Sequence, residues 1–191
     1  MKRVFIVHRW GGSPNADWYE WLKEKLEKKG FHVTIPTMPN PDTPEITSWV
    51  NTLRKAVGKP DSDTFFVGHS IGCQTILRYL ESLPNNVKVG GAVFVAGWFV
   101  LTPESTPTEQ EQKIAKPWLE QQINFKKVRS HIDKMVTILS DNDPYVPLIE
   151  NQCDFDTLGA KIIVQRKKGH YDTESKTFTL PVALKALLGL A

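Results

Sequence analysis

The sequence predicts an α/β fold, a three-layer αβα sandwich in which helices cover both faces of a mostly parallel sheet of about six strands. Short apolar runs without strict alternation recur along the 191 residues, which is typical of strands buried on both faces. Segments with apolar residues three or four positions apart lie between these runs and predict amphipathic helices. No internal repeat interrupts the alternation, so we expect residues 1–191 to form a single domain.

Six runs rich in β-branched and aromatic residues predict the strands. Each run has four to six residues, which suits a buried strand better than a helix. In chain order the predicted strands are Val4–His8, Phe31–Ile35, Thr64–Val67, Gly91–Ala96, Val136–Ser140 and Lys161–Gln165.

Apolar stripes predict the helices between these strands. The helix Trp18–Leu26 is ended by Gly30, and the helix Cys73–Leu83 is ended by Pro84. The polar stretch Thr102–Gln112 contains two prolines and predicts an insertion at the edge of the sheet rather than a domain boundary. The other predicted helices are Ile46–Leu53, Ile114–Ile123, Ile149–Phe155 and Leu180–Leu188.

The composition excludes several protein classes. With 40% hydrophobic and 24% charged residues, the chain is neither disordered nor fibrous. The net charge of 24 − 21 = +3 is too small to indicate nucleic-acid binding, and the run Arg166–Lys168 is typical of a solvated turn. The two cysteines, Cys73 and Cys153, suggest free thiols in a reducing compartment.

Membrane insertion is not expected. The longest weakly polar run, Val89–Leu101, has 13 residues, which is short of the roughly 18 that a spanning helix needs. The apolar run Val4–Val7 is too short for the core of a signal peptide. We therefore expect a cytoplasmic protein without a membrane segment.

The segment Gly68–Gly72 carries the sharpest chemical signal. It reads Gly-His-Ser-Ile-Gly, follows a predicted strand and precedes a predicted helix. This is the strand–turn–helix context of a nucleophile elbow, in which the two glycines let strand and helix crowd the turn. The context predicts that the Ser70 hydroxyl is a nucleophile at the carboxyl edge of the sheet.

A serine nucleophile needs a base and an acid, which follow it in the order acid, then histidine, in the elbow fold. His170 comes just after the last predicted strand and is the best candidate for the base. Asp141 and Asp143 both follow the preceding strand. We favour Asp143, because Pro144 restricts it to an extended conformation that aims the carboxylate away from the helix. Asp141 would then support the turn.

Two backbone amides are predicted to stabilise the oxyanion that forms during acyl transfer. The first is the N–H of Ile71, directly after the nucleophile. The second comes from the loop after the first strand, where the Trp10 N–H is the choice and the Arg9 N–H the alternative.

With these positions assembled, the chain resembles the α/β-hydrolases and, within them, the YdeN-like family that includes the retinoblastoma-binding serine hydrolases. The shared features cover nearly the whole length, and the Trp pair and the Met-Pro-Asn-Pro segment are the most specific. They are the first strand ending in His8, Asp17-Trp18, Trp21-Leu22, Met38–Pro41, Trp49 with Leu53, Gly68–Cys73, Ser140–Pro144 and Gly169-His170.

The resemblance implies a compact hydrolase fold that lacks the first two strands of a full-length α/β-hydrolase and has at most a small lid. It implies a triad of Ser70, Asp143 and His170. One position departs from the family pattern: Arg9 stands where relatives usually have glycine. Its side chain would either narrow the oxyanion loop or offer a cation to an acidic substrate.

Two functions follow from these residues. The first is a serine hydrolase that cleaves a small ester, thioester or amide through an acyl-enzyme, with carboxylesterase activity favoured over amidase or peptidase activity. The second is a protein-binding module with an idle triad. Neither function needs a cofactor, and the chain has no His-x-x-x-His, Cys-x-x-Cys or phosphate-loop motif.

The expected substrate pocket comprises Arg9, Trp98, Phe99, Trp118, Tyr145 and Tyr171.

Overall fold

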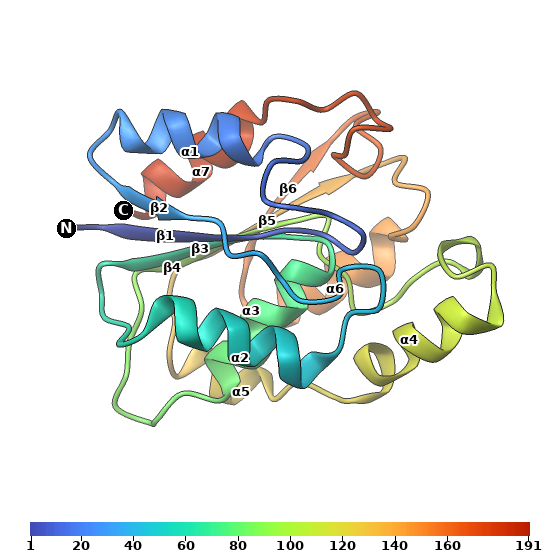
Figure 1. Ribbon diagram of the computed structural model, residues 1–191, viewed down its shortest axis with the longest axis horizontal. Helices are drawn as coiled ribbons and strands as arrows, with labels where there is room; N and C mark the ends of the chain where they lie inside the picture. Colours follow the sequence, from blue (N-terminus) through green and yellow to red (C-terminus); the bar gives the residue numbers. More distant parts are fainter.

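A six-stranded sheet with the order β2-β1-β3-β4-β5-β6 forms the centre of the computed structural model, which describes residues 1–191 (Figure 1). All five strand pairings are parallel, so the carboxyl ends of the strands meet at one edge. The strands are β1 Arg3–Val7, β2 His32–Thr34, β3 Thr64–His69, β4 Gly91–Val95, β5 Met135–Ser140 and β6 Lys161–Gln165.

Helices cover both faces of this sheet, as the sequence predicts. Figure 1 shows α1 and α7 on one face and α2, α3, α5 and α6 on the other. Each face buries its own apolar cluster, which includes Leu22 and Leu187 on the first face and Trp49 and Ile76 on the second. The helices are α1 Tyr19–Glu27, α2 Ile46–Val57, α3 Ile71–Glu81, α4 Glu109–Glu120, α5 Phe125–Arg129, α6 Leu148–Leu158 and α7 Pro181–Leu190, with a 3₁₀ turn at Pro103–Ser105.

The predicted strands are all present, with ends shifted by at most two residues, and the α/β fold class is confirmed. The region around α4 differs from the prediction. This helix begins at Glu109 rather than near Ile114, because Thr108 and Glu111 form a reciprocal capping box. The short helix α5 was not predicted, because its sequence has two lysines in five residues and little periodicity.

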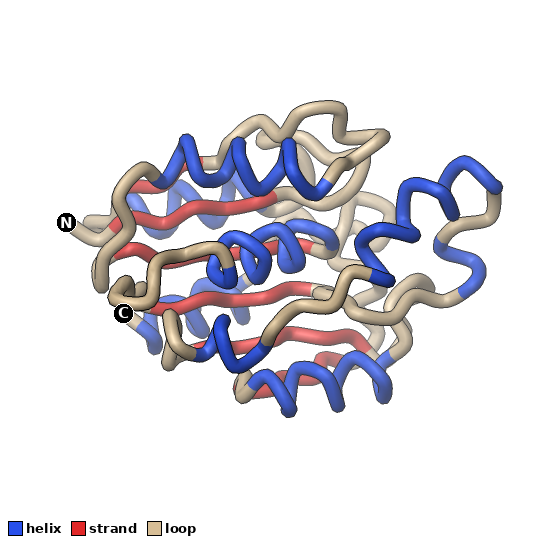
Figure 2. The backbone as a smooth tube through the Cα atoms, turned by 90° about the horizontal axis from the view of Figure 1, so that it is seen from below, coloured by secondary structure: helices blue, strands red, loops and turns tan.

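The polar stretch between β4 and α4 projects beyond the sheet. Figure 2 shows α4 and the preceding 3₁₀ turn past the carboxyl ends of the strands. This segment therefore stands beside the edge where the predicted catalytic residues lie. No helix of the structure has the length and apolar character needed to cross a membrane.

The start of α3 lies unusually close to β1 and β3. A Cβ atom built on Gly72 would lie 2.3 Å from the carbonyl oxygen of Val7, and one on Gly68 would lie 2.7 Å from the Cys73 nitrogen. Both contacts are with backbone, which cannot move aside as a flexible side chain can. The two glycines therefore allow α3 to approach β1 and β3 closely. This close approach sets the position of Ser70, which lies midway between the two glycines.

We expect Gly72→Ala to destabilise the protein by about 1–3 kcal/mol, the usual cost of inserting a methyl group into a packed site. At this chain length that corresponds to a fall in Tm of roughly 2–12 °C, measured by circular dichroism. Gly189→Ala is the matched control, because no atom lies within 4 Å of a Cβ built there. Equal melting temperatures for the two variants would contradict the close approach.

Candidate active site

Ser70 occupies a sharp turn between β3, which ends at His69, and α3, which begins at Ile71. Its backbone has φ 54° and ψ −121°, a conformation that L residues rarely adopt. The Ser70 amide donates to the carbonyl of Val95 at the end of β4, at 2.9 Å. Strained backbone of this kind concentrates at functional sites. This backbone conformation places the Ser70 hydroxyl at the carboxyl edge of the sheet.

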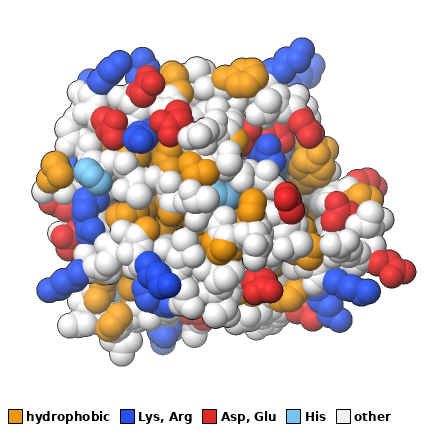
Figure 3. Space-filling view, viewed as in Figure 1, with side chains coloured by type: hydrophobic (Ala, Val, Ile, Leu, Met, Phe, Trp, Pro, Cys, Tyr) orange, Lys and Arg blue, Asp and Glu red, His pale blue; other side chains and the backbone are white.

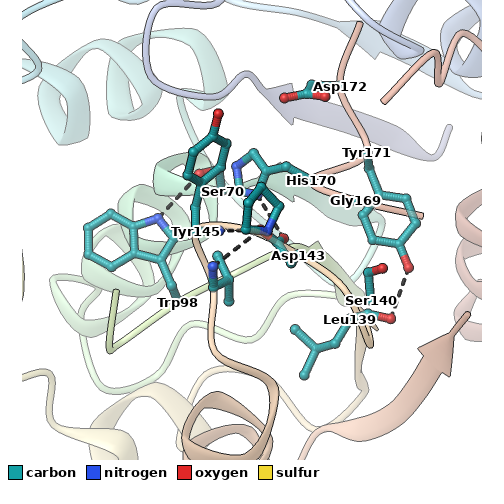
Figure 4. Close-up of polar contacts among 12 residues, drawn as sticks. Ser70, Trp98, Leu139, Ser140, Asp143, Tyr145, Gly169, His170, Tyr171 and Asp172 are labelled. Carbon is teal, nitrogen blue, oxygen red and sulfur yellow. Dashed lines mark hydrogen bonds and ion pairs between the residues drawn. The ribbon is translucent and has the colours of Figure 1, made fainter. Parts of the chain in front are cut away.

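His170 and Asp143 form a short contact beside this turn (Figure 4). The imidazole Nδ1 lies 2.8 Å from Asp143 Oδ2, and the two side chains are only 7% and 2% exposed. Asp143 Oδ1 accepts from the amides of Tyr145 and Val146, at 2.9 and 3.2 Å, so the carboxylate cannot rotate freely. A carboxylate on Nδ1 holds the ring in the tautomer that leaves Nε2 free to accept a proton.

Asp141 has a different environment from Asp143. Its Oδ1 accepts from the Lys167 amide at 2.7 Å, and it makes no contact with His170. The side chain of Asn142 between them accepts from the Ser140 hydroxyl and the Gly169 amide, both at 2.9 Å. Asp141 and Asn142 thus fasten the loop after β5 to the loop that carries the histidine.

The Ser70 hydroxyl accepts a hydrogen bond from Trp98 Nε1 at 3.2 Å, and Figure 4 shows this bond beside the His170 ring. Ser70 and His170 line the same cavity, but no hydrogen bond joins them. Catalytic hydrogen bonds are often absent from unliganded sites and form when substrate binds. A serine hydroxyl can accept one hydrogen bond and donate another, so the bond from Trp98 leaves the Ser70 proton free for another acceptor.

The loop that carries His170 is itself tightly folded. The residues on either side, Gly169 and Tyr171, both have positive φ, of 53° and 58°. The Tyr171 hydroxyl donates to the Leu139 carbonyl on β5, and the Tyr171 carbonyl accepts from Trp18 Nε1, both at 2.9 Å. These bonds tie the loop to both sides of the sheet edge and fix the direction of the imidazole.

A buried hydrogen-bond chain joins this loop to the loop after β1. His69 Nε2 lies 2.7 Å from the His170 carbonyl, so it carries the proton, and its Nδ1 accepts from the Tyr19 hydroxyl at 2.7 Å. The Tyr19 oxygen in turn accepts from the Arg9 amide at 3.2 Å. The sequence did not predict this role for His69 or Tyr19. In that part of the sequence, only the neighbouring Asp17-Trp18 pair was singled out, as a feature shared with the family that the chain resembles.

Buried titratable groups in this network predict acid sensitivity. Burial, aided by the neighbouring His170, lowers the pKa of His69 from 6.5 to about 3. Burial alone would raise the pKa of Asp17, but His69, Arg9 and Thr173 outweigh it and lower the value. In both cases the unfolded chain binds protons that the folded chain does not, so stability falls as the pH drops.

We therefore expect the Tm to fall steadily from about pH 6.5 towards about pH 4, because unfolded histidine titrates near 6.5. His69→Gln removes one titrating group, while its amide can still donate to the His170 carbonyl. Melts of this variant should show a shallower dependence on pH than melts of the wild type. Parallel curves for the two proteins would contradict the burial of neutral His69.

The loop after β1 leaves the Trp10 amide unpaired. The Arg9 amide donates to Tyr19, so this alternative oxyanion donor is already occupied. The amides of Trp10 and Ile71 have no protein acceptor. His8 fixes the loop, because its Nδ1 lies 2.8 Å from the Arg9 carbonyl and its Nε2 accepts from the Met38 amide at 3.2 Å.

The Arg9 side chain folds back over its own loop. Its Nε donates to Asp17 Oδ2 at 2.9 Å, and Nη1 donates to the Trp10 carbonyl at 3.1 Å. The fully buried Asp17 carboxylate balances the guanidinium charge. The sequence suggested that Arg9 would either narrow the oxyanion loop or offer a cation to an acidic substrate. Because its guanidinium is already paired with Asp17, the structure disfavours the second alternative.

The residues around Ser70 enclose a cavity of about 200 Å³. Three of the six expected pocket residues, Arg9, Trp98 and Tyr145, line it. Glu111, Asp172 and Glu174 contribute three carboxylates to the lining, whereas Arg9, its only arginine, is paired with Asp17. The rim of the cavity is therefore acidic. The lining comprises Arg9, Trp10, Ser70, Trp98, Leu101, Ser105, Glu111, Tyr145, His170, Asp172 and Glu174.

The other three expected pocket residues do not line this cavity. Phe99 packs against Phe155, with ring centroids 5.0 Å apart, and Trp118 donates through Nε1 to the Pro44 carbonyl. Tyr171 is fully buried. The expectation for these residues was wrong, because position near a strand end does not determine which side of the loop a ring faces.

Cys73 is also buried, and burial raises the pKa of its thiol, which makes it a poor nucleophile.

Comparisons with known proteins agree with this geometry. The family model described as serine hydrolase matches residues 4–188. The hydrolase YdeN of Bacillus subtilis is 28% identical over 97% of this chain and 94% of its own length. The serine hydrolase RBBP9 of Rattus norvegicus is 24% identical over 89% of this chain and 87% of its own.

Solved structures extend the likeness to the fold. The crystal structure of the B. subtilis ydeN product superimposes with a TM-score of 0.91 and 26% identity, over 100% of this chain and 98% of that one. Est1E from Butyrivibrio proteoclasticus has a TM-score of 0.71 at 14% identity, over 99% of this chain and 88% of that one, which indicates a shared fold only.

Proposed function

Because the chain belongs to the serine hydrolase family, we propose that Ser70, His170 and Asp143 are a catalytic triad that hydrolyses a small carboxylic ester or a related thioester or amide. The observation that supports this most strongly is the buried contact of 2.8 Å between Asp143 and His170 at the rim of a cavity that also contains Ser70. These groups have the types and mutual order that acyl transfer requires.

In the first half of the proposed reaction, the Ser70 oxygen attacks the substrate carbonyl carbon while its proton passes to His170 Nε2. Asp143 stabilises the imidazolium that forms. The negative charge on the carbonyl oxygen is met by the amides of Ile71 and Trp10, which have no other acceptor. The imidazolium then gives its proton to the leaving oxygen, sulfur or nitrogen, the bond to the leaving group breaks, and an ester of Ser70 remains.

In the second half, water replaces the leaving group. His170 takes a proton from the water as its oxygen attacks the acyl carbon, and the same two amides stabilise the second oxyanion. Return of that proton to the Ser70 oxygen releases the carboxylic acid and restores the site. The chain's own groups complete this cycle without a cofactor.

The cavity supports small, uncharged or cationic substrates. Its volume of about 200 Å³ suits a short acyl group, and Trp10 and Tyr145 offer aromatic surfaces. Glu111, Asp172 and Glu174 would repel an anionic substrate. Over the face shown in Figure 3, basic and acidic side chains are interspersed, which also favours a small molecule over a nucleic acid as partner.

The test is a chain-length series of p-nitrophenyl esters. We expect the wild type to cleave the acetate and butyrate with a kcat/KM at least tenfold above that for the dodecanoate, because the long chain does not fit the cavity. Release of p-nitrophenol is followed by absorbance. Absence of turnover with every ester would instead favour a protein-binding module with an idle triad.

A further inference from the structure

Arg78 on α3 is a buried cation with no acidic partner. It is 5% exposed, and no carboxylate forms an ion pair with it. A guanidinium cannot lose its proton to avoid burial, so the charge persists. Burial of an unpaired charge is costly, and proteins normally balance it with a carboxylate or another anion.

The hydrogen bonds of Arg78 leave part of this charge unbalanced. All of them come from Nη2, which donates to Gln74 Oε1 and to the carbonyls of Trp118 and Gln121, at 3.0, 3.0 and 2.8 Å. The two carbonyls belong to the carboxyl end of α4, whose dipole supplies about half a negative charge. Nε is buried without a partner, and Nη1 donates to no protein group.

Arg78 lines a cavity of about 250 Å³, separate from the one at Ser70, between α3, α4 and the loop that leads to α5. Nη1 is not sealed from solvent as Nε is, so a ligand in this cavity can reach it. Most of the rest of the lining is apolar, including Phe99, Trp118, Ile123 and Phe125.

The surroundings of the guanidinium add to its positive charge. On its other side Arg78 lines a polar hollow, to which Arg54 and Lys127 also contribute. Glu81 is the only acidic residue of that hollow, and it attracts the Arg78 guanidinium without coming close enough to form an ion pair. The region therefore has an excess of cations around unused guanidinium donors, next to an apolar cavity.

We propose that this second cavity binds a small monocarboxylate with an aromatic or short aliphatic tail. Its carboxylate accepts from Arg78 Nη1 and completes the balance of the buried charge, since guanidinium and carboxylate match in geometry. Its tail packs against Phe99, Trp118 and Phe125. A phosphate ester would leave polar oxygens against these rings, whereas one carboxylate on an apolar body satisfies both parts of the cavity.

The test measures binding of benzoate to the Ser70→Ala protein by NMR of the six tryptophan indole N–H signals. Use of this variant separates the result from the proposed catalysis, since binding is measured whether or not Ser70 is a nucleophile. We expect saturable shifts of the Trp118 signal with benzoate and at least tenfold weaker binding of uncharged benzyl alcohol. Equal affinity for the two ligands, or shifts confined to Trp10 and Trp98 at the other cavity, would overturn the proposal.

Two variants assign the binding to the proposed groups. Arg78→Gln should weaken benzoate binding at least tenfold and leave benzyl alcohol unaffected. Because loss of Arg78 also removes bonds to α4, Phe125→Glu provides a second variant that leaves Arg78 in place. It puts a carboxylate into the cavity that Arg78 lines and should abolish benzoate binding. Benzoate binding unchanged in a folded Phe125→Glu protein would contradict the site.

Discussion

Replacement of Ser70 with alanine is expected to reduce turnover of a short p-nitrophenyl ester by a factor on the order of 10⁶, the loss seen when the serine nucleophile of a triad is removed. Without the hydroxyl no acyl-enzyme can form, and only binding and oxyanion stabilisation remain. Ser70 is 6% exposed, and the substitution removes a single hydrogen bond, from Trp98, so the fold should persist. Initial rates and thermal melts on the same samples measure the two effects separately.

Ser105→Ala is the matched control for this prediction. Ser105 lines the same cavity, but its hydroxyl donates to the Tyr145 carbonyl at 2.9 Å and makes no hydrogen bond with His170. It should keep most of the activity. Cys73→Ala should also remain active, because the thiol is buried against Val95. An active Ser70→Ala protein together with an inactive Cys73→Ala protein would show that the nucleophile is misassigned.

Asp143→Asn is expected to lower kcat on the order of 10⁴-fold with little change in KM, as for the acid of a comparable triad. The amide cannot stabilise the imidazolium, and it presents a donor or a neutral acceptor to His170 Nδ1. The fold should be maintained, because the amide oxygen can still accept from Tyr145 and Val146. Kinetics at saturating ester give kcat directly.

Asp141→Asn separates the two aspartates. Its side chain accepts from the Lys167 amide and makes no contact with His170, so the substitution should cost about 1 kcal/mol of stability and spare the activity. If Asp141→Asn were the inactive variant and Asp143→Asn the active one, the acid would lie two residues earlier in the loop.

Local features of the sequence were enough to predict much of the fold. The strand Lys161–Gln165 is marked by its own β-branched residues, and the turn at Ser70 is marked by a short glycine motif; both occur where expected. The order of Ser70, Asp143 and His170 along the chain also predicts that they meet at one sheet edge. Their catalytic roles stay predictions until the variants are measured.

Features that depend on packing between distant segments could not be predicted in the same way. The hydrogen-bond chain from Arg9 to His170 joins two loops through Tyr19 at the start of α1 and His69 at the end of β3, and no local pattern marks its members. The outward or inward direction of Phe99 is likewise set by Phe155 on a distant helix. The start of α4 does have a local signal, because Thr108 and Glu111 have the spacing of a capping box, which indicates a helix that begins at Glu109.

The most direct test of the central claim is peptide mapping of the protein after reaction with a fluorophosphonate. The reagent loses fluoride as phosphorus bonds to the attacking oxygen, and only a nucleophile activated by a base reacts readily. We predict one adduct, on the peptide that contains Ser70, and no adduct in the His170→Ala protein. An adduct on another residue, or none after long incubation of the wild type, would contradict the account.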